Sequence, residues 1–390
     1  MQHKENFTII FVFHRSFYDL HRGQGIYLYN LIFSLIKFFP VILVDPNGIN
    51  EAMSTKIESK ESHNFLNGLL LSFLNFLKYL HSNLNRTNFV VLSEDLYISG
   101  LIVFICKLLK IPFIYRSSDY GIIYRRKLLS SLGINGKFLP FILSKFENLL
   151  INCSDFVIVP SMDSMNDMLN NGVSDKKICF FPHVSIPYTP HSTEISFLKK
   201  KLNLEGKTSI IFFGNMEYKP NLDSALFVIE LSRQINKTFS DDDSIFILAG
   251  KNSCELKSYA SKNLIILGEV ENAQLLLSVC DIGLNPSSVP GGTSIKVIDY
   301  LVNGLHVIST KEGAYGIIKN ERLIICKREK FLDNIMHLKS ILKSELFDAN
   351  QVPKVIKDIY MSESQIKSIA KKISSLYNIR TISKNRKRDN

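Results

Sequence analysis

The sequence lacks the cysteine spacing of a metal site or a disulfide framework. Its six cysteines are scattered singly, mostly inside apolar runs, and no two of them form a C-x-x-C pair. Isolated thiols of this kind are typical of proteins in a reducing compartment. The cysteines therefore predict neither a structural zinc site nor disulfide bonds.

Long apolar runs are also missing. No stretch reaches the roughly 18 unbroken apolar residues that a membrane-spanning helix requires. The apolar run in the first segment, MQHKENFTIIFVFHR, is too short for a signal peptide, and no small-residue cleavage site follows it. We therefore expect a cytoplasmic protein without a transmembrane helix.

Acidic residues are outnumbered by basic ones. The chain has 47 Lys and Arg against 36 Asp and Glu, which gives a formal net charge of +11 and an isoelectric point near 9.2. This balance indicates an anionic partner, which can be nucleic acid, an anionic membrane surface or a phosphorylated substrate. Because the sequence has no helix-turn-helix, zinc pattern or aromatic-basic RNA motif, we expect no nucleic acid partner.

The order of apolar runs predicts an α/β fold. Residues 7–13, FTIIFVF, read as a buried parallel strand, and a loop, a helical pattern and the strand VILVD follow. The same alternation restarts after a proline-bearing linker, so 390 residues are expected to form two doubly wound domains. We predict Rossmann-like domains at residues 1–190 and 191–390 with a cleft between them, and C-terminal helices that can cross back to the first domain.

Two features of the first half leave alternatives open. Gly23 and Gly25 lie in the loop after the first strand, where such folds bind ligands, but a G-x-G without a third glycine is equally consistent with a tight turn. Residues 64–80, NFLNGLLLSFLNFLKYL, form either a core helix or an interfacial helix that lies on a membrane, since the polar face carries little charge.

The stretch from Pro286 to Thr310, PSSVPGGTSIKVIDYLVNGLHVIST, is the strongest candidate for a ligand site. It reads as a glycine-rich turn, a short helix, a glycine stop and a buried strand. Gly291 and Gly292 allow the backbone to approach a ligand closely. The helix start that follows provides free N–H groups, which form an anion site.

Polar side chains of this stretch share one helix face. Thr293 or Ser294 can cap the helix, and Thr293, Lys296 and Asp299 recur at a spacing of three. A hydroxyl, a cation and a carboxylate at a helix start suit a diphosphate with a sugar hydroxyl beyond it. The alternative is an ordinary turn before a packed helix.

An acidic run, Asp241 to Asp243, is compatible with a divalent metal ion. The run falls in a loop between a helix and a strand, away from the carboxyl ends of the strands. We therefore predict a solvated charge run and not a metal site.

Several segments together resemble GT-B glycosyltransferases of family 4. In the second half these are FFGNMEYKPNLDSALFVIE at 212–230, LIILGEV at 264–270 and GGTSIKVIDYLVNGLHVIST at 291–310. In the first half, RGQGIYLYNLIFSLIK resembles the family's first loop and helix, and FENLLINCSDFVIVPSMDSMNDMLNNGVSDKKICFFPH resembles the run that closes its acceptor domain. The resemblance covers most of residues 7–315.

The resemblance implies a reaction and its partners. A sugar is transferred from a nucleotide-diphosphate donor to a hydroxyl of a glycan or lipid-linked acceptor, with retention and without a metal ion or other cofactor. The second domain binds the nucleotide sugar. The basic balance fits a peripheral position on the inner face of the cytoplasmic membrane.

The resemblance also implies roles for individual residues. The loop of Gly214 approaches the donor phosphates, Lys219 and Lys296 supply positive charge, and Asp299 stands where the family usually has a glutamate that binds the ribose hydroxyls. The backbone near Val270 packs against the base. The donor site predicted in this way consists of Gly214, Lys219, Val270, Gly292, Thr293, Lys296 and Asp299, with Gly23 and Gly25 on the acceptor side.

Two departures from the family pattern leave other functions open. The family's first acidic residue is replaced by Gly291, and Ser118-Asp119 stands where the family often has His-Asp. Asp119 and Lys296 are the candidate catalytic residues. The alternatives are a degenerate nucleotide-sugar-binding protein without activity and a GT-B-type sugar epimerase.

Overall fold

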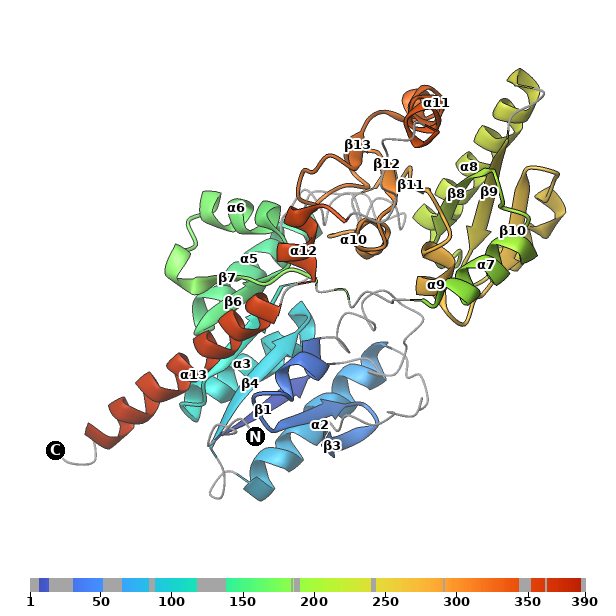
Figure 1. Ribbon diagram of the computed structural model, residues 1–390. Coiled ribbons are helices and arrows are strands. Elements are labelled where there is room, and N and C mark those ends of the chain that lie inside the picture. The colour runs from blue at the N-terminus through green and yellow to red at the C-terminus, as the bar shows by residue number, and fades with distance from the viewer. Residues whose placement is uncertain are drawn as a thin grey trace. The chain divides into compact units, whose positions relative to one another are not determined.

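A computed structural model describes most of the chain in two compact units. The described residues are 7–13, 31–51, 65–83, 88–117, 138–183, 185, 190–239, 243–289, 292–343, 352–361 and 363–386. Unit 1 comprises Met1–Val184 and Ser362–Asn390, and unit 2 comprises Ser185–Met361 (Figure 1). The predicted division at residue 190 lies shortly after this junction, and the last helix of the chain, α13 (Glu363–Arg386), belongs to unit 1.

Unit 1 is built on a sheet in which all neighbours are parallel except β2 and β3. The strand order is β3-β2-β1-β4-β5-β6-β7, so the chain winds outward in both directions from β1 and β4. The predicted strand at 7–13 is the interior strand β1, which lies between β2 and β4, and its side chains are almost entirely buried. The strands are β1 (Thr8–Val12), β2 (Val41–Asp45), β3 (Gly48–Glu51), β4 (Phe89–Glu94), β5 (Phe113–Arg116), β6 (Phe156–Val159) and β7 (Ile178–Phe180).

Helices of unit 1 pack their apolar sides onto this sheet. One core joins Phe76 of α2, Ile102 of α3 and Leu150 of α5 to strand residues such as Val91 and Val157. The helices with described bounds are α2 (Phe65–Asn83), α3 (Leu96–Leu108), α5 (Phe138–Cys153), α6 (Met162–Asn170), η1 (Asp175–Lys177) and α13.

Unit 2 contains a fully parallel sheet with the order β10-β9-β8-β11-β12-β13. Alternate residues of β8 point to opposite faces, so Ile211 enters one core while Ile210 and Phe212 enter the other. Burial on both faces explains why these strands are continuous apolar runs. The elements are α7 (Ser192–Lys201), β8 (Thr208–Phe213), α8 (Lys219–Thr238), β9 (Ser244–Ala249), η2 (Ser253–Tyr259), β10 (Leu264–Gly268), α9 (Ala273–Leu277), β11 (Ile282–Asn285), α10 (Ile295–Val302), β12 (His306–Ser309), β13 (Leu323–Ile325), η3 (Arg328–Lys330), α11 (Phe331–Leu342) and α12 (Lys354–Tyr360).

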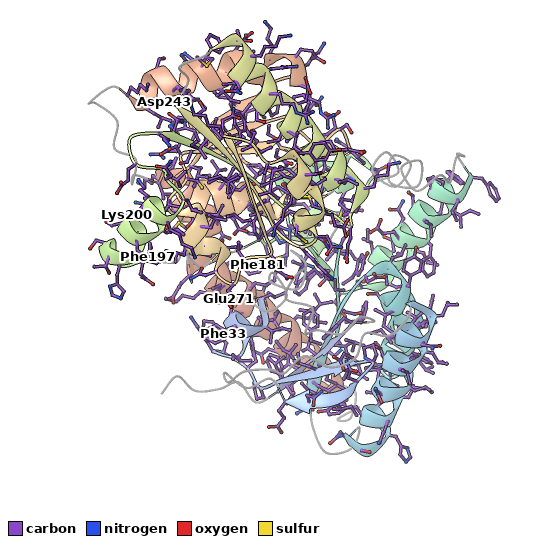
Figure 2. All side chains as sticks on the ribbon, turned by 90° about the vertical axis from the view of Figure 1, so that its right-hand side faces the viewer. Phe33, Phe181, Phe197, Lys200, Asp243 and Glu271 are labelled. Carbon is purple, nitrogen blue, oxygen red and sulfur yellow. The ribbon has the colours of Figure 1, made fainter. Side chains whose placement is uncertain are left out.

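Asp243 corrects the prediction of a solvated acidic run. Its carboxylate accepts from the Nζ atoms of Lys339 at 2.7 Å and Lys343 at 2.8 Å, which ties the start of β9 to α11 (Asp243 is labelled in Figure 2). Partial burial acts to raise the pKa of Asp243, but the two lysines outweigh it and hold the pKa at about 2. Asp243 is therefore a structural ion-pair partner, while Asp241 and Asp242 lie outside the described residues.

Candidate functional site

The predicted donor residues gather at the point in unit 2 where the winding direction reverses. From β8 the chain proceeds outward through β9 and β10, and from β11 it proceeds outward through β12 and β13. Open α/β sheets bind ligands beyond the carboxyl ends of the strands at such a switch point. The loops after β8 and β11 lie there, and they lead into α8 and α10.

The turn after β8 depends on two glycines in direct contact. The N–H of Gly214 donates to the carbonyl oxygen of Ala249 at 3.0 Å. Gly250 has a φ of +118°, and a Cβ placed on it would lie 2.1 Å from the carbonyl oxygen of Gly214. The two backbone segments can therefore pass this close only because Gly250 lacks a side chain.

The substitution Gly250→Ala is expected to destabilise unit 2 by about 3 kcal/mol or more, since it combines a steric overlap with a left-handed backbone. Gly206→Ala is the matched control, because Gly206 has a φ of +69° but no atom within 4 Å of an added Cβ. The control should lose only about 1–2 kcal/mol. Urea unfolding measures both, and equal losses would show that the contact with Gly214 does not constrain the turn.

Lys296 lies on the first turn of α10, and its ammonium group reaches the loop after β8. Nζ donates to Oδ1 of Asn221 at 2.7 Å and lies 4.4 Å from the ring centroid of Phe212. A Cβ placed on Gly214 would lie 3.2 Å from the same Nζ atom. Burial lowers the pKa of Lys296 to about 7, because the charged form has lost water. Among the described residues Lys296 makes no salt bridge, and its hydrogen-bond partner Asn221 is a neutral amide.

Asn221 is a site residue that the sequence did not reveal. Its Nδ2 donates to the carbonyl oxygen of Asn215 at 2.9 Å, while its Oδ1 accepts from Lys296. One amide thus links the turn after β8 to α10. An asparagine in the first turn of a helix reads as a turn residue, and nothing in its spacing indicates a partner 75 positions away.

Tyr300 fixes α10 against the sheet. Its hydroxyl accepts from the N–H of Phe213 at 2.8 Å, the residue directly before Gly214. A Cβ on Gly283 of β11 would lie 2.3 Å from the Tyr300 ring, so this glycine provides the space for it. The helix that carries Lys296 and Asp299 is therefore held in register with the turn after β8.

The start of α10 differs from the prediction. Ser294 occupies the position before the helix, but its side chain caps no N–H group and instead accepts from Nδ2 of Asn285 at 3.1 Å. The same Nδ2 donates to the carbonyl oxygen of Gly313 at 2.8 Å, which ties the loops after β11 and β12 together. The N–H of Val297 donates to the carbonyl oxygen of Ser294, whereas the N–H groups of Ile295 and Lys296 have no acceptor among the described residues and can meet an external one.

Thr293 presents a hydroxyl with no partner in the region that the structure describes. The residue is 7% exposed, and its Oγ1 atom is buried without a hydrogen bond. Gly292 beside it has a φ of +70°, as the prediction of a glycine-dependent turn requires. A buried hydroxyl left unsatisfied costs free energy, so Thr293 Oγ1 would gain from a hydrogen bond to a ligand at this turn.

Asp299 lies one turn further along α10. Its Oδ1 accepts from Oγ of Ser185 at 2.9 Å and from Nε2 of Gln274 at 3.5 Å. Burial raises the pKa of Asp299 to about 6, and the two hydrogen bonds only partly offset it. Thr293 stands just before α10, and Lys296 and Asp299 lie on the helix. The polar groups of all three predicted residues are shielded from water by burial.

The remaining predicted residues are less closely tied to this cluster. Lys219 is the first residue of α8 and is exposed, and Val270 is half-buried just after β10, against the core below α10. Gly23, Gly25, Asp119 and Gly291 lie outside the described residues. Their assigned roles stay predictions.

The described residues contain no group of three or more His, Cys, Asp and Glu side chains that could hold a metal ion. They also contain no helix of the length and apolar character needed to cross a bilayer.

Comparison with known proteins places the cluster within a known family model. The model described as "Glycosyl transferases group 1" matches residues 207–340, which include the turn after β8 and all of α10. No curated protein matches the sequence.

Solved structures resemble the whole chain at low identity. Sucrose-phosphate synthase from Thermosynechococcus elongatus has a TM-score of 0.67 at 13% identity, covering 97% of this chain and 100% of its own. HepE from Anabaena, solved with UDP-glucose, has a TM-score of 0.65 at 13% identity, covering 94% and 99%. UDP-GlcNAc 2-epimerase from Methanocaldococcus jannaschii has a TM-score of 0.57 at 13% identity, covering 95% and 99%. At these identities the likeness concerns the fold.

Proposed function

We propose that this chain, which has the GT-B fold and carries a domain of the glycosyl transferases group 1 family, transfers a sugar from a nucleotide-diphosphate donor to the hydroxyl of a glycan or lipid-linked acceptor. The family match and the two doubly wound sheets confirm the predictions of a GT-B architecture and of a glycosyltransferase. Retention of configuration, independence of metal ions and a role in polysaccharide synthesis belong to the proposal.

The observation that carries the proposal is the unneutralised Lys296 ammonium at the switch point. A desolvated cation beside a glycine turn costs free energy, because no carboxylate compensates it in the described region. A diphosphate supplies the missing negative charge. Thr293 Oγ1 and the open first turn of α10 offer hydrogen-bond donors to the same group.

The mechanism follows from where charge develops. As the bond between sugar and diphosphate breaks, negative charge accumulates on the leaving oxygen, and Lys296 and the start of α10 stabilise it. The carboxylate of Asp299 accepts from a ribose hydroxyl and so fixes the nucleotide. Asp119 acts at the reacting sugar or acceptor. HepE was solved with UDP and with UDP-glucose, which supports testing uridine nucleotides first.

Thr293→Val tests the donor site, since valine has the shape of threonine without the hydroxyl. Donor affinity should fall about tenfold, the cost of one hydrogen bond to a charged group. The folded protein should be as stable as the wild type or more so, because an unsatisfied buried hydroxyl is removed. Calorimetric titration with UDP and thermal unfolding measure the two effects. Unchanged UDP affinity would remove Thr293 from the site.

A panel of nucleotide sugars, with and without acceptors, separates the proposed transferase from its alternatives. Transfer, or slow donor hydrolysis, is expected for at least one donor. A sugar that returns from the incubation still attached to the nucleotide but with inverted configuration would indicate an epimerase. Binding by calorimetry without any turnover would indicate a degenerate binding protein.

A further inference from the structure

Unit 1 exposes large apolar side chains along the outer face of α2. Leu66 is 73% exposed, Leu70 56%, Leu74 50% and Leu77 36%, and their spacing places them on one side of the helix. The opposite side of α2 is buried in the core of unit 1 through Phe76 and Leu80. The helix is therefore apolar on both its core side and its outer side.

The two helices that follow α2 in the chain continue this pattern. On α3 the exposed apolar residues again fall on one side, and on α5 they span the first turns and recur near the end. The exposed large apolar side chains of the two helices are Tyr97, Leu101, Phe104 and Leu108 on α3, and Phe138, Leu139, Phe141, Ile142 and Leu149 on α5.

The three helices form one surface. A Cβ placed on Gly100 of α3 would lie 2.4 Å from the Phe146 ring of α5, so these two helices are in close contact. Residues of α2 and α3 pack into the same core beneath them, where Phe76 and Ile102 belong to one cluster. We call the outer faces of α2, α3 and α5 the apolar face of unit 1. Exposed apolar patches of this extent mark interaction sites.

Charge on this face has a single sign. Lys78, Lys107 and Lys145 are exposed on α2, α3 and α5, and Nζ of Lys145 lies 5.4 Å from the ring centroid of Phe141. The only acidic residue within the three helices is Glu147, which is buried and accepts from Tyr115 and Ser117. At the edge of the face, half-buried Asp95 caps α3 and accepts from the N–H of Tyr97. Within the helices themselves the apolar side chains are interspersed with lysines and no carboxylate is exposed, which is typical of surfaces that enter a lipid headgroup layer.

We propose that the apolar face of unit 1 docks on an anionic phospholipid surface. Leucine and phenylalanine side chains enter the boundary between headgroups and acyl chains, and the lysines contact the lipid phosphates. The chain lies on the membrane, since no helix in the described residues can cross it. Under this proposal both interpretations of residues 64–80 hold, since the core side of α2 packs in unit 1 and its outer side would be interfacial.

A second copy of the chain fits the apolar face of unit 1 less well than anionic lipid does. In a symmetric dimer the same patch faces itself, so Lys78, Lys107 and Lys145 of both copies would be brought together. The three helices offer no exposed carboxylate to pair with them. Anionic lipid supplies the opposite charge. Membrane docking itself does not depend on the proposed function. The proposed function supplies only the reason for docking, which is to bring the donor domain to a lipid-linked acceptor.

The test is co-sedimentation of the full chain with vesicles of phosphatidylcholine, alone or mixed with phosphatidylglycerol. The wild type should bind the mixed vesicles at least tenfold more tightly than pure phosphatidylcholine. The triple variant Leu70→Gln, Leu74→Gln, Phe104→Gln should lose about tenfold or more of this affinity, because it removes inserted apolar area. Replacing Lys78, Lys107 and Lys145 by Ala should abolish the preference for phosphatidylglycerol.

The matched control carries the same kind of change in unit 2. Phe197, Leu226 and Phe239 are also exposed, and Phe197 lies on α7, where Figure 2 labels it. Their replacement by Gln should leave vesicle binding unchanged. All variants should keep the thermal unfolding midpoint and the UDP affinity of the wild type, so a failed docking surface is distinguishable from a failed donor site.

Three results would overturn the proposal. The first is equal binding of pure and mixed vesicles by the wild type. The second is unchanged vesicle binding by the leucine and phenylalanine triple variant. The third is a wild-type dimer in solution that the same variant converts to a monomer with vesicle binding intact, which would identify the face as a protein interface.

Discussion

Replacing Lys296 by methionine is expected to reduce sugar transfer by about 100-fold or more, because the leaving diphosphate loses its desolvated cation. Methionine is close to lysine in length and keeps the apolar stem against Phe212. The loss should be carried by both kcat and donor affinity. A purified Lys296→Met protein with near-normal transfer rates would exclude Lys296 from catalysis.

The same substitution should stabilise the fold at neutral pH. The pKa of Lys296 is about 7 in the folded protein, well below its ordinary value. Between about pH 7 and 10 the unfolded chain therefore binds more protons at this residue, and wild-type stability rises with pH across that window. Lys296→Met removes this rise. Its advantage over the wild type should be greatest at pH 7 and below and should vanish toward pH 10 in urea unfolding.

Replacing Lys296 by arginine keeps a positive charge at this position but removes its titration near neutral pH. Wild-type affinity for UDP should decline as pH rises above about 7, since the ammonium deprotonates in the free protein. Lys296→Arg keeps its charge at every relevant pH. It should bind UDP with little pH dependence of this origin, whereas a decline identical to the wild type would assign the pH effect to another group.

How far the sequence predicts this molecule depends on the range over which a residue acts. The strands at 7–13 and 209–214 are continuous apolar runs, and burial on both faces of a parallel sheet makes such runs recognisable. The face of Thr293, Lys296 and Asp299 follows from helical spacing alone. Local periodicity is thus sufficient for the fold class, and it proposes the core of the candidate site, which stays a prediction.

Contacts between distant segments were not predictable in the same way. Asn221 binds Lys296 across 75 positions, and Ser185 binds Asp299 across 114, with no pattern in the sequence that connects them. Gly283 reads as a weak point in a strand, and its reason, the ring of Tyr300, exists only in the folded sheet. The outer face of α2 was ambiguous because the sequence does not tell which apolar side of a helix meets water.

Local capping chemistry also misled the prediction at one point. Ser294 stands where a capping residue belongs, but its hydroxyl accepts from Asn285 in the neighbouring loop. A tertiary hydrogen bond thus replaces the local one. The consequence is functional under the proposal, because the N–H groups of Ile295 and Lys296 in the first turn of α10 are kept for the diphosphate.

Replacing Asp299 by asparagine is expected to weaken donor binding by about 10- to 100-fold, the cost of a hydrogen bond to a charged acceptor, with a smaller effect on kcat. The carboxylate contacts the ribose in the proposal, away from the bond that breaks. Its partners Ser185 and Gln274 hold Oδ1 and leave the second oxygen, Oδ2, for the ligand. Donor affinity equal to the wild type by calorimetry would contradict this role.

The pH dependence of Asp299 has the opposite sign to that of Lys296. Its folded pKa of about 6 lies above the ordinary value, so the folded state binds more protons between about pH 4 and 6 and wild-type stability falls as pH rises through that window. Asp299→Asn should therefore be more stable than the wild type at pH 7, with a difference that shrinks toward pH 4. Donor affinity of the wild type should also fall below about pH 6, where the carboxyl is protonated.

Ser185→Ala is the matched variant for this assignment. The Ser185 hydroxyl donates to Oδ1 of Asp299 and lowers its pKa, acting against burial. Without it the pKa of Asp299 should rise above 6, and the pH at which donor affinity is half lost should move upward with it. Because the diphosphate itself titrates in this range, each profile is compared with that of Asp299→Asn, in which the carboxyl is absent. If the midpoint of the affinity profile stays in place in Ser185→Ala, the profile reports a group other than Asp299. A shifted midpoint would show that protonation of the Asp299 carboxyl group, on the same helix as Lys296, controls donor recognition.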